Sequence, residues 1–311
     1  MPLLCCETAT SIRRINMANL LTIENEHGTA VFAPAAGAGL RSLKAGSGAD
    51  AIQLLTGGDG EHDAGEHPSG GGCFIMAPWS NRIRDGVFEH EGRSYFVPEN
   101  APPHAIHGTV NELPFEIVEQ AASAVTLQSS LGDLWPFEGS ITLRAELEAG
   151  SLVQEITIAS DGETFPAGFG WHPWIQRNLG GGDVSIAAPV TDMWILDEAM
   201  MPTGERAPLH DEFDIRERVT PEIGSLDDCF RIQPGEVTTL EWPEVSLQIQ
   251  SSPNLAHLQV YTPSDSICVE PQTAAVNAFQ LAARGIPGTG AEIVSPERPL
   301  IGSTRWTWNK I

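Results

Sequence analysis

The sequence has little positive charge. Its 311 residues include 17 Lys and Arg against 41 Asp and Glu, which gives a formal net charge of −24 with histidine neutral. Proteins that bind nucleic acid need clustered cationic side chains, because those side chains replace the counterions of the phosphate backbone. The composition therefore argues against a nucleic-acid partner, and it also argues against a highly anionic substrate.

Long apolar runs are absent as well. No stretch reaches the roughly 18 apolar residues that a membrane-spanning helix needs, and the beginning of the chain does not have the pattern of a secretory signal. We therefore expect no membrane partner and a cytoplasmic location. A more regular pattern begins at Met17, after the stretch MPLLCCETATSIRRIN. Residues 1–16 are predicted to be a disordered leader, and residues 17–311 are predicted to be a single domain.

Cysteine is scarce and has no metal-binding or disulfide pattern. There are five cysteines, two of them in the leader, and none forms a CxxC pair. This spacing argues against a zinc site and against a disulfide framework. Cys73, Cys229 and Cys268 are each flanked by apolar residues. We predict that they are buried, reduced thiols.

Signatures of metal and nucleotide binding are also missing. The segment TGGDGEHDAGEHPSGGG (residues 56–72) contains acidic and histidine side chains. Their spacing suits neither helical nor strand ligand pairs, so a solvated loop is predicted there. No GxxxxGK[ST] motif occurs, and GIPGTG at 285–290 neither follows a clear strand nor opens a helix. We expect no metal and no cofactor.

What the sequence does contain is a period of two. The segment ITLRAELEA (141–149) alternates apolar with polar side chains, as a half-buried strand requires. The same alternation occurs near 125–127, 156–158 and 245–249, and 31 Gly and 23 Pro supply turns between such segments. Only residues 273–285 have a weakly helical pattern, whereas a parallel sheet would need many crossover helices. The pattern predicts an all-β fold, a large antiparallel β-sandwich or barrel.

Four regions place polar side chains in apolar or conformationally constrained surroundings. Glu270 in ICVEPQT is the most informative, because so apolar a strand should not carry an ionised group without a partner or a task. The other candidates are Arg82 in APWSNRIRDGVF, His107 in HAIHGTV, His172 in GFGWHPWIQ and Asp227 in SLDDCF.

Each candidate also has a purely structural interpretation. Arg82 could pair with a structural carboxylate, and His107 and His172 could be core histidines bonded to the backbone. Asp227 could be a turn or cap residue. The tryptophans of these segments, Trp174 among them, could serve packing alone, although flat aromatic faces beside polar groups also hold sugars. The functional interpretation gains weight because the four regions occur together.

Taken in order, these segments resemble the signature segments of the aldose 1-epimerase (galactose mutarotase) family. The resemblance rests on NRIRDGVFEHEGRSYFVPEN followed by HAIHG, then GFGWHPWI, LDDCF and HLQVYTPSDSICVEPQT. It covers most of the chain from about Met17 onward. It implies a galactose mutarotase-like supersandwich of antiparallel sheets with a sugar site on one concave face.

The same resemblance implies roles for individual residues. Glu270 would be the general base and His172 the general acid, while Arg82, His107 and Asp227 would match sugar-binding positions. Trp174 stands where the family commonly has Tyr or Phe, and we expect it to contact the substrate. The implied activity is interconversion of the α and β anomers of a free monosaccharide, without metal or cofactor.

The chemistry suits these residue types. Anomer exchange needs a base to take the proton of the anomeric hydroxyl and an acid to protonate the ring oxygen, so that the ring opens. We expect burial to raise the pKa of Glu270 and nearby negative charge to favour the protonated form of His172.

Two other classes of function stay open. A noncatalytic sugar-binding or regulatory protein would keep Arg82 and Asp227 without needing both Glu270 and His172. A glycoside-processing enzyme would use two carboxylates, for which Asp227 and Glu270 are the candidate pair.

Overall fold

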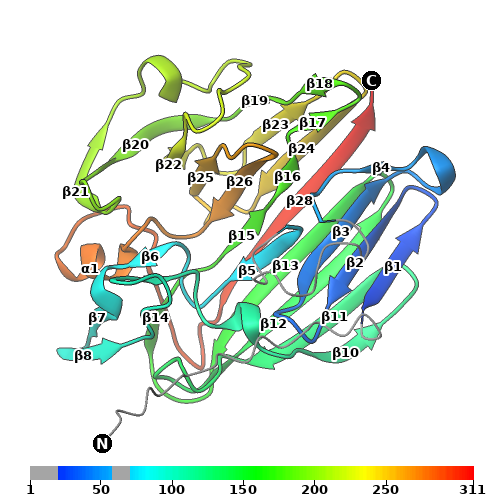
Figure 1. Ribbon diagram of the computed structural model, residues 1–311. Coiled ribbons are helices and arrows are strands. Elements are labelled where there is room, and N and C mark those ends of the chain that lie inside the picture. Colours follow the sequence, from blue (N-terminus) through cyan, green and yellow to red (C-terminus); the bar gives the residue numbers. More distant parts are fainter. Residues whose placement is uncertain (1–19, 58–70) are drawn as a thin grey trace, which may run out of the picture.

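The fold is built from two large antiparallel sheets (Figure 1). The structure is a computed structural model, which describes residues 20–57 and 71–311. The predicted leader and most of the glycine-rich segment at 56–72 lie outside the described residues. Every pairing between named strands is antiparallel in the described part of the chain, as the period of two predicts. No helix in the described ranges is long and apolar enough to cross a membrane.

The larger sheet carries the candidate site residues. It has twelve strands, in the order β1-β2-β3-β5-β15-β26-β25-β22-β20-β21, with β16 beside β26 and β4 beside β3. Its strands are β1 (Leu21–Asn25), β2 (Gly28–Ala33), β3 (Gly39–Ala45), β4 (Ile52–Gln53), β5 (Cys73–Met76), β15 (Gly170–Pro173), β16 (Ile175–Gln176), β20 (Val190–Leu196), β21 (Pro202–Ala207), β22 (Asp227–Ile232), β25 (His257–Tyr261) and β26 (Ser266–Gln272).

The second sheet has eight strands, in the order β10-β11-β12-β13-β28-β24-β23-β19. These are β10 (Glu116–Gln120), β11 (Ala124–Ser130), β12 (Gly139–Glu148), β13 (Ser151–Ser160), β19 (Ser185–Ala187), β23 (Val237–Glu241), β24 (Val245–Ser251) and β28 (Leu300–Lys310). All four segments in which alternation predicts a strand are strands here, within β11, β12, β13 and β24. In β12 the apolar side chains from Ile141 to Leu147 are buried at every second position.

Shorter elements connect the sheets. The helix α1 (Ala278–Ala283) lies inside the segment with the weakly helical pattern, and 3-10 turns occupy Gly48–Asp50, Arg84–Gly86, Val110–Glu112 and Asp211–Phe213. Four two-stranded sheets complete the fold: β6 (Arg82–Ile83) with β9 (Ala105–Ile106), β7 (Val87–His90) with β8 (Arg93–Phe96), β14 (Phe165–Ala167) with β27 (Glu292–Val294), and β17 (Asn178–Leu179) with β18 (Gly182–Asp183).

One apolar cluster joins the two large sheets. It contains Ile75, Trp171 and Val269 from the larger sheet together with Leu143 and Trp306 from the smaller one. Because side chains alternate along a strand, the neighbours of these residues in the larger sheet must point to its other face. That other face carries the polar side chains of β15, β22, β25 and β26, so the core on one side of the sheet positions the candidate site on the other.

Candidate functional site

Glu270 and His172 are in direct contact at the centre of the larger sheet. Gly170 pairs with Gln272 and Ile175 with Ile267, so the same register places His172 across from Glu270. Nε2 of His172 lies 3.2 Å from Oε1 of Glu270, and the two side chains are 8% and 2% exposed. The pair is therefore almost entirely removed from water.

Aromatic rings hold the His172 imidazole in place. The ring stacks on Phe74 of β5, with centroids 4.5 Å apart, and on Trp174, with centroids 5.2 Å apart. The other oxygen of Glu270, Oε2, accepts a hydrogen bond of 3.1 Å from Nε2 of Gln272. Both members of the pair thus have fixed orientations before any ligand arrives, which favours proton transfer at a defined place.

Burial controls the charge of this pair. Loss of hydration raises the pKa of Glu270 well above its ordinary value, and the neighbouring Asp227 carboxylate raises this pKa further. The Gln272 hydrogen bond and the charge of Arg82 oppose that rise in pKa only in part. Burial also lowers the pKa of His172 to about 3. Burial therefore favours the protonated form of the carboxyl group and the neutral form of the imidazole.

One expectation is thereby confirmed and another is wrong. Burial does raise the pKa of Glu270. The pKa of His172 is not raised by nearby negative charge; burial lowers it, and a hydrogen bond with the backbone opposes that fall only in part. The 3.2 Å contact between Nε2 of His172 and Oε1 of Glu270 therefore lies in surroundings that favour uncharged groups.

Arg82 and His107 are brought together by the small sheet of β6 and β9. Arg82 pairs with Ile106, and the His107 N–H donates to the carbonyl oxygen of Asn81 at 2.9 Å. The His107 ring contacts that of His172 edge-on, with centroids 5.2 Å apart. Both Arg82 and His107 are half-buried, so their side chains remain open to solvent at the edge of the buried pair.

Gly108 allows this arrangement. Its backbone has φ +75°, and an added Cβ would overlap the carbonyl group of Ala77. That carbonyl oxygen accepts a hydrogen bond from Thr109. The close backbone approach at Gly108 therefore sets where His107 lies.

A Gly108→Ala substitution should destabilise the fold more than the same substitution at Gly92. Both glycines have nearly the same positive φ, but nothing lies within 4 Å of a Cβ added at Gly92. The left-handed backbone alone costs about 1–2 kcal/mol for alanine, whereas the overlap with Ala77 adds about 1–3 kcal/mol at Gly108 alone. Urea unfolding of the two variants measures the difference in the free energy of unfolding. Equal losses in both would contradict the assigned packing.

Asp227 begins strand β22 and is held by a side chain that sequence reasoning missed. Gln259 lies across from Glu270 on β25, and its Nε2 donates to Oδ1 of Asp227 at 2.8 Å. Its Oε1 accepts from Nδ2 of Asn81 at 3.3 Å, and Oδ1 of Asn81 accepts from the N–H of Arg82 at 2.9 Å. A chain of amides thus connects Arg82 with Asp227. The alternation of polar and apolar residues in HLQVY was the available signal for Gln259.

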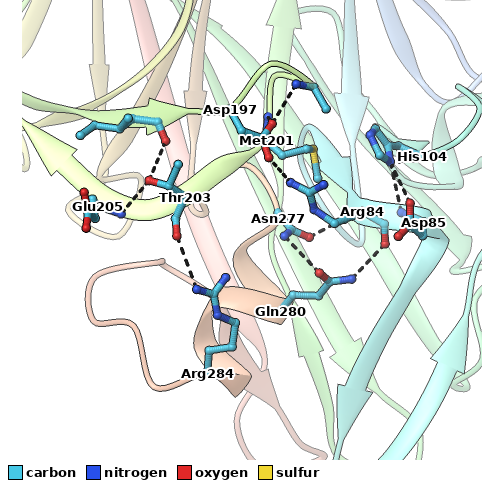
Figure 2. A network of polar contacts seen from close by, with 12 residues as sticks. Arg84, Asp85, His104, Asp197, Met201, Thr203, Glu205, Asn277, Gln280 and Arg284 are labelled. Carbon is cyan, nitrogen blue, oxygen red and sulfur yellow. Dashed lines mark hydrogen bonds and ion pairs between the residues drawn. The ribbon is translucent and has the colours of Figure 1, made fainter.

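A second network holds the segment that carries Arg82 (Figure 2). The backbone N–H of Asn277 donates to the Arg82 carbonyl oxygen at 2.7 Å, and its Oδ1 accepts from the Arg84 N–H at 3.1 Å. Gln280 of α1 donates to the Arg84 carbonyl oxygen at 2.9 Å, and the Arg84 guanidinium forms a 2.5 Å ion pair with Asp197. The helix and the β20–β21 hairpin therefore brace the arginine segment.

The remaining histidine and two of the three tryptophans of the four regions are structural. Nδ1 of His104 accepts a hydrogen bond of 3.2 Å from the backbone of Asp85, as Figure 2 shows. Trp79 and Trp171 are buried in the main core. Trp174 is half-buried beside His172 and meets the Tyr261 ring edge-on, with centroids 6.2 Å apart. Trp174 is thus the tryptophan whose ring adjoins the candidate pair.

The three described cysteines are buried and free, as predicted. Cys268 lies two residues before Glu270 on the same strand. Among described residues, His172, Cys268 and Glu270 form a group whose potential ligand atoms all lie within 4.8 Å of one another. These are the residues that could hold a metal ion in the described part of the chain.

Comparisons with known proteins agree with this geometry. The family model described as aldose 1-epimerase matches residues 19–287. A curated relative, the uncharacterized protein YihR of Escherichia coli (strain K12), is 28% identical over 221 residues, which are 66% of this chain and 70% of that protein.

Solved structures share the fold at low identity. A galactose mutarotase-like protein from Clostridium acetobutylicum is 17% identical, with a TM-score of 0.84 over 94% of this chain and 95% of that one. The GalM/aldose epimerase homologue from C. elegans is 18% identical, with a TM-score of 0.81 over 94% and 99% of the two chains. A galactose 1-epimerase from Lactobacillus acidophilus NCFM is also 18% identical, with a TM-score of 0.75 over 94% of each chain. The galactose mutarotase-like fold expected from the sequence is confirmed.

Proposed function

The chain belongs to the aldose 1-epimerase family, and on that premise we propose that it interconverts the α and β anomers of a free aldose by general acid and base catalysis. The observation that carries this proposal is the buried contact of 3.2 Å between His172 and Glu270. A base and an acid held side by side are what ring opening and closure require.

In the proposed reaction, Glu270 takes the proton of the anomeric hydroxyl while His172 gives a proton to the ring oxygen. The bond between the anomeric carbon and the ring oxygen breaks, and the sugar opens to its aldehyde. Rotation about the adjacent carbon–carbon bond presents the other face of the carbonyl. The ring closes as His172 takes back its proton and Glu270 returns its own to the new anomeric oxygen. No atom is lost, and both groups regain their starting protonation.

The shifted pKa values suit these roles. A carboxylate with a raised pKa is a stronger base, and an imidazolium with a lowered pKa is a stronger acid. The neutral pair that burial favours is the protonation state reached once the ring has opened. A ring-closed sugar reacts with the ionic pair, which forms when a proton moves from Glu270 to His172, and ring closure regenerates that ionic pair.

The half-buried residues around the pair would hold the sugar. Arg82, His107 and Asp227 can donate to or accept from sugar hydroxyl groups, and the Trp174 ring offers an apolar face to a pyranose. Since Gln259 already holds the side chain of Asp227, little conformational entropy of that side chain would be lost on binding. An uncharged monosaccharide fits this set, and the scheme uses neither metal nor cofactor.

Polarimetry on freshly dissolved α-anomers of several aldoses tests the proposal. The protein should accelerate the change in optical rotation of at least one free sugar beyond the buffer rate. In parallel, aryl glycosides of the same sugars should release no aglycone. Release of aglycone would instead support the glycoside-processing alternative, which would use Asp227 and Glu270. Binding without accelerated rotation would support a noncatalytic sugar-binding protein.

A further inference from the structure

Cys268 brings a third potential metal ligand to the catalytic pair. The ligand atoms of His172, Cys268 and Glu270 lie within 4.8 Å of one another, and the His172–Glu270 contact is 3.2 Å. Tetrahedral zinc holds nitrogen, sulfur and oxygen ligands at about 2.0–2.3 Å, which places the ligand atoms roughly 3.3–3.8 Å apart. The distances between the three ligand atoms therefore need to shorten only slightly for the atoms to surround an ion.

The sheet holds these three side chains on one face. Cys268 and Glu270 are two residues apart on β26, so they point the same way, and His172 lies across from Glu270 on β15. Between them, Val269 packs into the main core on the opposite face. Cys268 itself is fully buried, as is nearly all of Glu270. The three ligands are therefore positioned by a packed sheet and not by a loose surface loop.

The chemistry of the three ligands selects the class of ion. Imidazole, thiolate and carboxylate are together the ligand set of zinc-like ions, and sulfur disfavours magnesium and calcium. On binding, the thiol proton of Cys268 and the carboxyl proton of Glu270 pass to solvent. The two negative charges left behind balance a divalent cation, so that the buried complex has no net charge.

We propose that His172, Cys268 and Glu270 form a binding site for a thiophilic divalent cation of the zinc class, and that an ion bound there inhibits the protein. Binding follows from the three ligands alone, whereas inhibition rests on the proposed function. An ion on Nε2 of His172 and on the Glu270 carboxylate occupies the lone pairs that would carry protons to and from the sugar.

Inhibition should be competitive with the sugar. His172 is the most exposed of the three buried ligands, at 8% of its side chain, so the ion should enter on the side of His172. The anomeric centre of the sugar needs the same two side chains. A saturating sugar should therefore protect the protein from the ion, and chelation should restore activity.

Direct binding is tested with Cd²⁺ as the probe. Cys5 and Cys6 are replaced by alanine in every protein tested, so that their thiols cannot bind the probe. Titration of this otherwise wild-type protein should produce the ultraviolet charge-transfer absorption of one cadmium–thiolate bond per chain. The Cys268→Ala variant should lose that absorption. Its affinity for Cd²⁺ should fall by more than about 10–100-fold, because that is the usual loss when only a hydrogen-bond partner of a metal ligand is removed, and here a ligand itself is removed. Cys229→Ala is the matched control, since Cys229 is also buried and free and lies on β22 outside the three-residue group. It should bind Cd²⁺ like the wild type.

Inhibition is tested separately with Zn²⁺ in the anomer-exchange assay. Wild type and Cys229→Ala should be inhibited and recover with EDTA, while the activity that Cys268→Ala has without metal should resist Zn²⁺. Absence of the cadmium–thiolate absorption in the folded wild-type protein would overturn the proposed site, whatever the protein's activity. Equal Cd²⁺ affinity of Cys268→Ala and wild type would also overturn it. Absence of anomer exchange despite Cd²⁺ binding would reject the proposed function and leave the site standing.

Discussion

Glu270→Gln is expected to lower the rate of anomer exchange by about 10²–10⁴-fold, the usual contribution of one well-placed proton-transfer group. The amide has the shape of the carboxyl group but can neither take the proton of the anomeric hydroxyl nor return it. Since Arg82, His107 and Asp227 are unchanged, KM should change much less than kcat. Polarimetric rates at several sugar concentrations separate the two constants.

The fold should tolerate this substitution. Burial raises the pKa of Glu270 well above its ordinary value, and a neutral glutamine in its place leaves no unpaired charge in the apolar surroundings. The amide oxygen can still accept the hydrogen bond that Gln272 donates. Thermal unfolding should therefore occur near the wild-type temperature. Glu155→Gln, at an exposed position on β13 of the other sheet, is the matched control and should keep full activity. A folded Glu270→Gln protein with near-normal kcat would remove Glu270 from the mechanism.

His172→Asn is expected to cause a loss of similar size, about 10²–10⁴-fold in kcat, because the ring oxygen loses its proton donor. This variant also loses two stacked aromatic contacts, with Phe74 and Trp174, each worth about 0.5–1.5 kcal/mol. Its unfolding temperature should therefore fall, unlike that of Glu270→Gln. Rates are to be measured well below that temperature, so that the loss reports chemistry and not unfolding.

Chemical rescue separates a proton-transfer role from a packing role. In His172→Ala, added imidazole can enter the space of the missing ring between Phe74 and Trp174 and should restore part of the rate. His27→Asn, at an exposed position remote in sequence, is the matched control and should behave like wild type in both assays. Full activity of folded His172→Asn would contradict the assignment of His172 as the acid.

Much of the fold could be predicted from local patterns. Alternation in 141–149 reports a strand with one buried face, because burial of one face imposes a period of two on the sequence. Strand β26 is different, since all seven of its residues are buried. An apolar run in the sequence is typical of such a strand, which is buried on both faces. Glu270 stands out there because it is an ionisable residue in an apolar segment.

The connections between distant residues could not be predicted. Asn81 and Gln259 share a hydrogen bond across 178 residues, and neither carries a local signal of its partner. The same holds for the ion pair that joins Arg84 to Asp197 of the β20–β21 hairpin. Such pairings depend on strand order and register, which single-strand periodicity does not determine. Periodicity alone likewise does not separate the core residue Trp171 from Trp174, three positions later, and it was the family resemblance that singled out Trp174.

The protonation state of the pair also required three-dimensional information. The sequence gives the number of acidic residues but not the hydration of His172, and the pKa of a histidine depends on its hydration as well as on neighbouring charge. With 41 acidic residues in the chain, a protonated imidazole was a natural expectation. The contact with Phe74 and Trp174 removes water from the ring, and that desolvation determines the result.

The most direct test of the proposed function is magnetisation exchange between the two anomeric protons of an aldose at equilibrium, measured by NMR with and without the protein. This measurement detects ring opening and closure without net reaction, label or coupled enzyme. We predict that saturating the α-anomer signal reduces the β-anomer signal when wild-type protein is present, and that Glu270→Gln returns this transfer to its buffer value. Transfer equal to the buffer value for every aldose tested with folded wild-type protein would contradict the account.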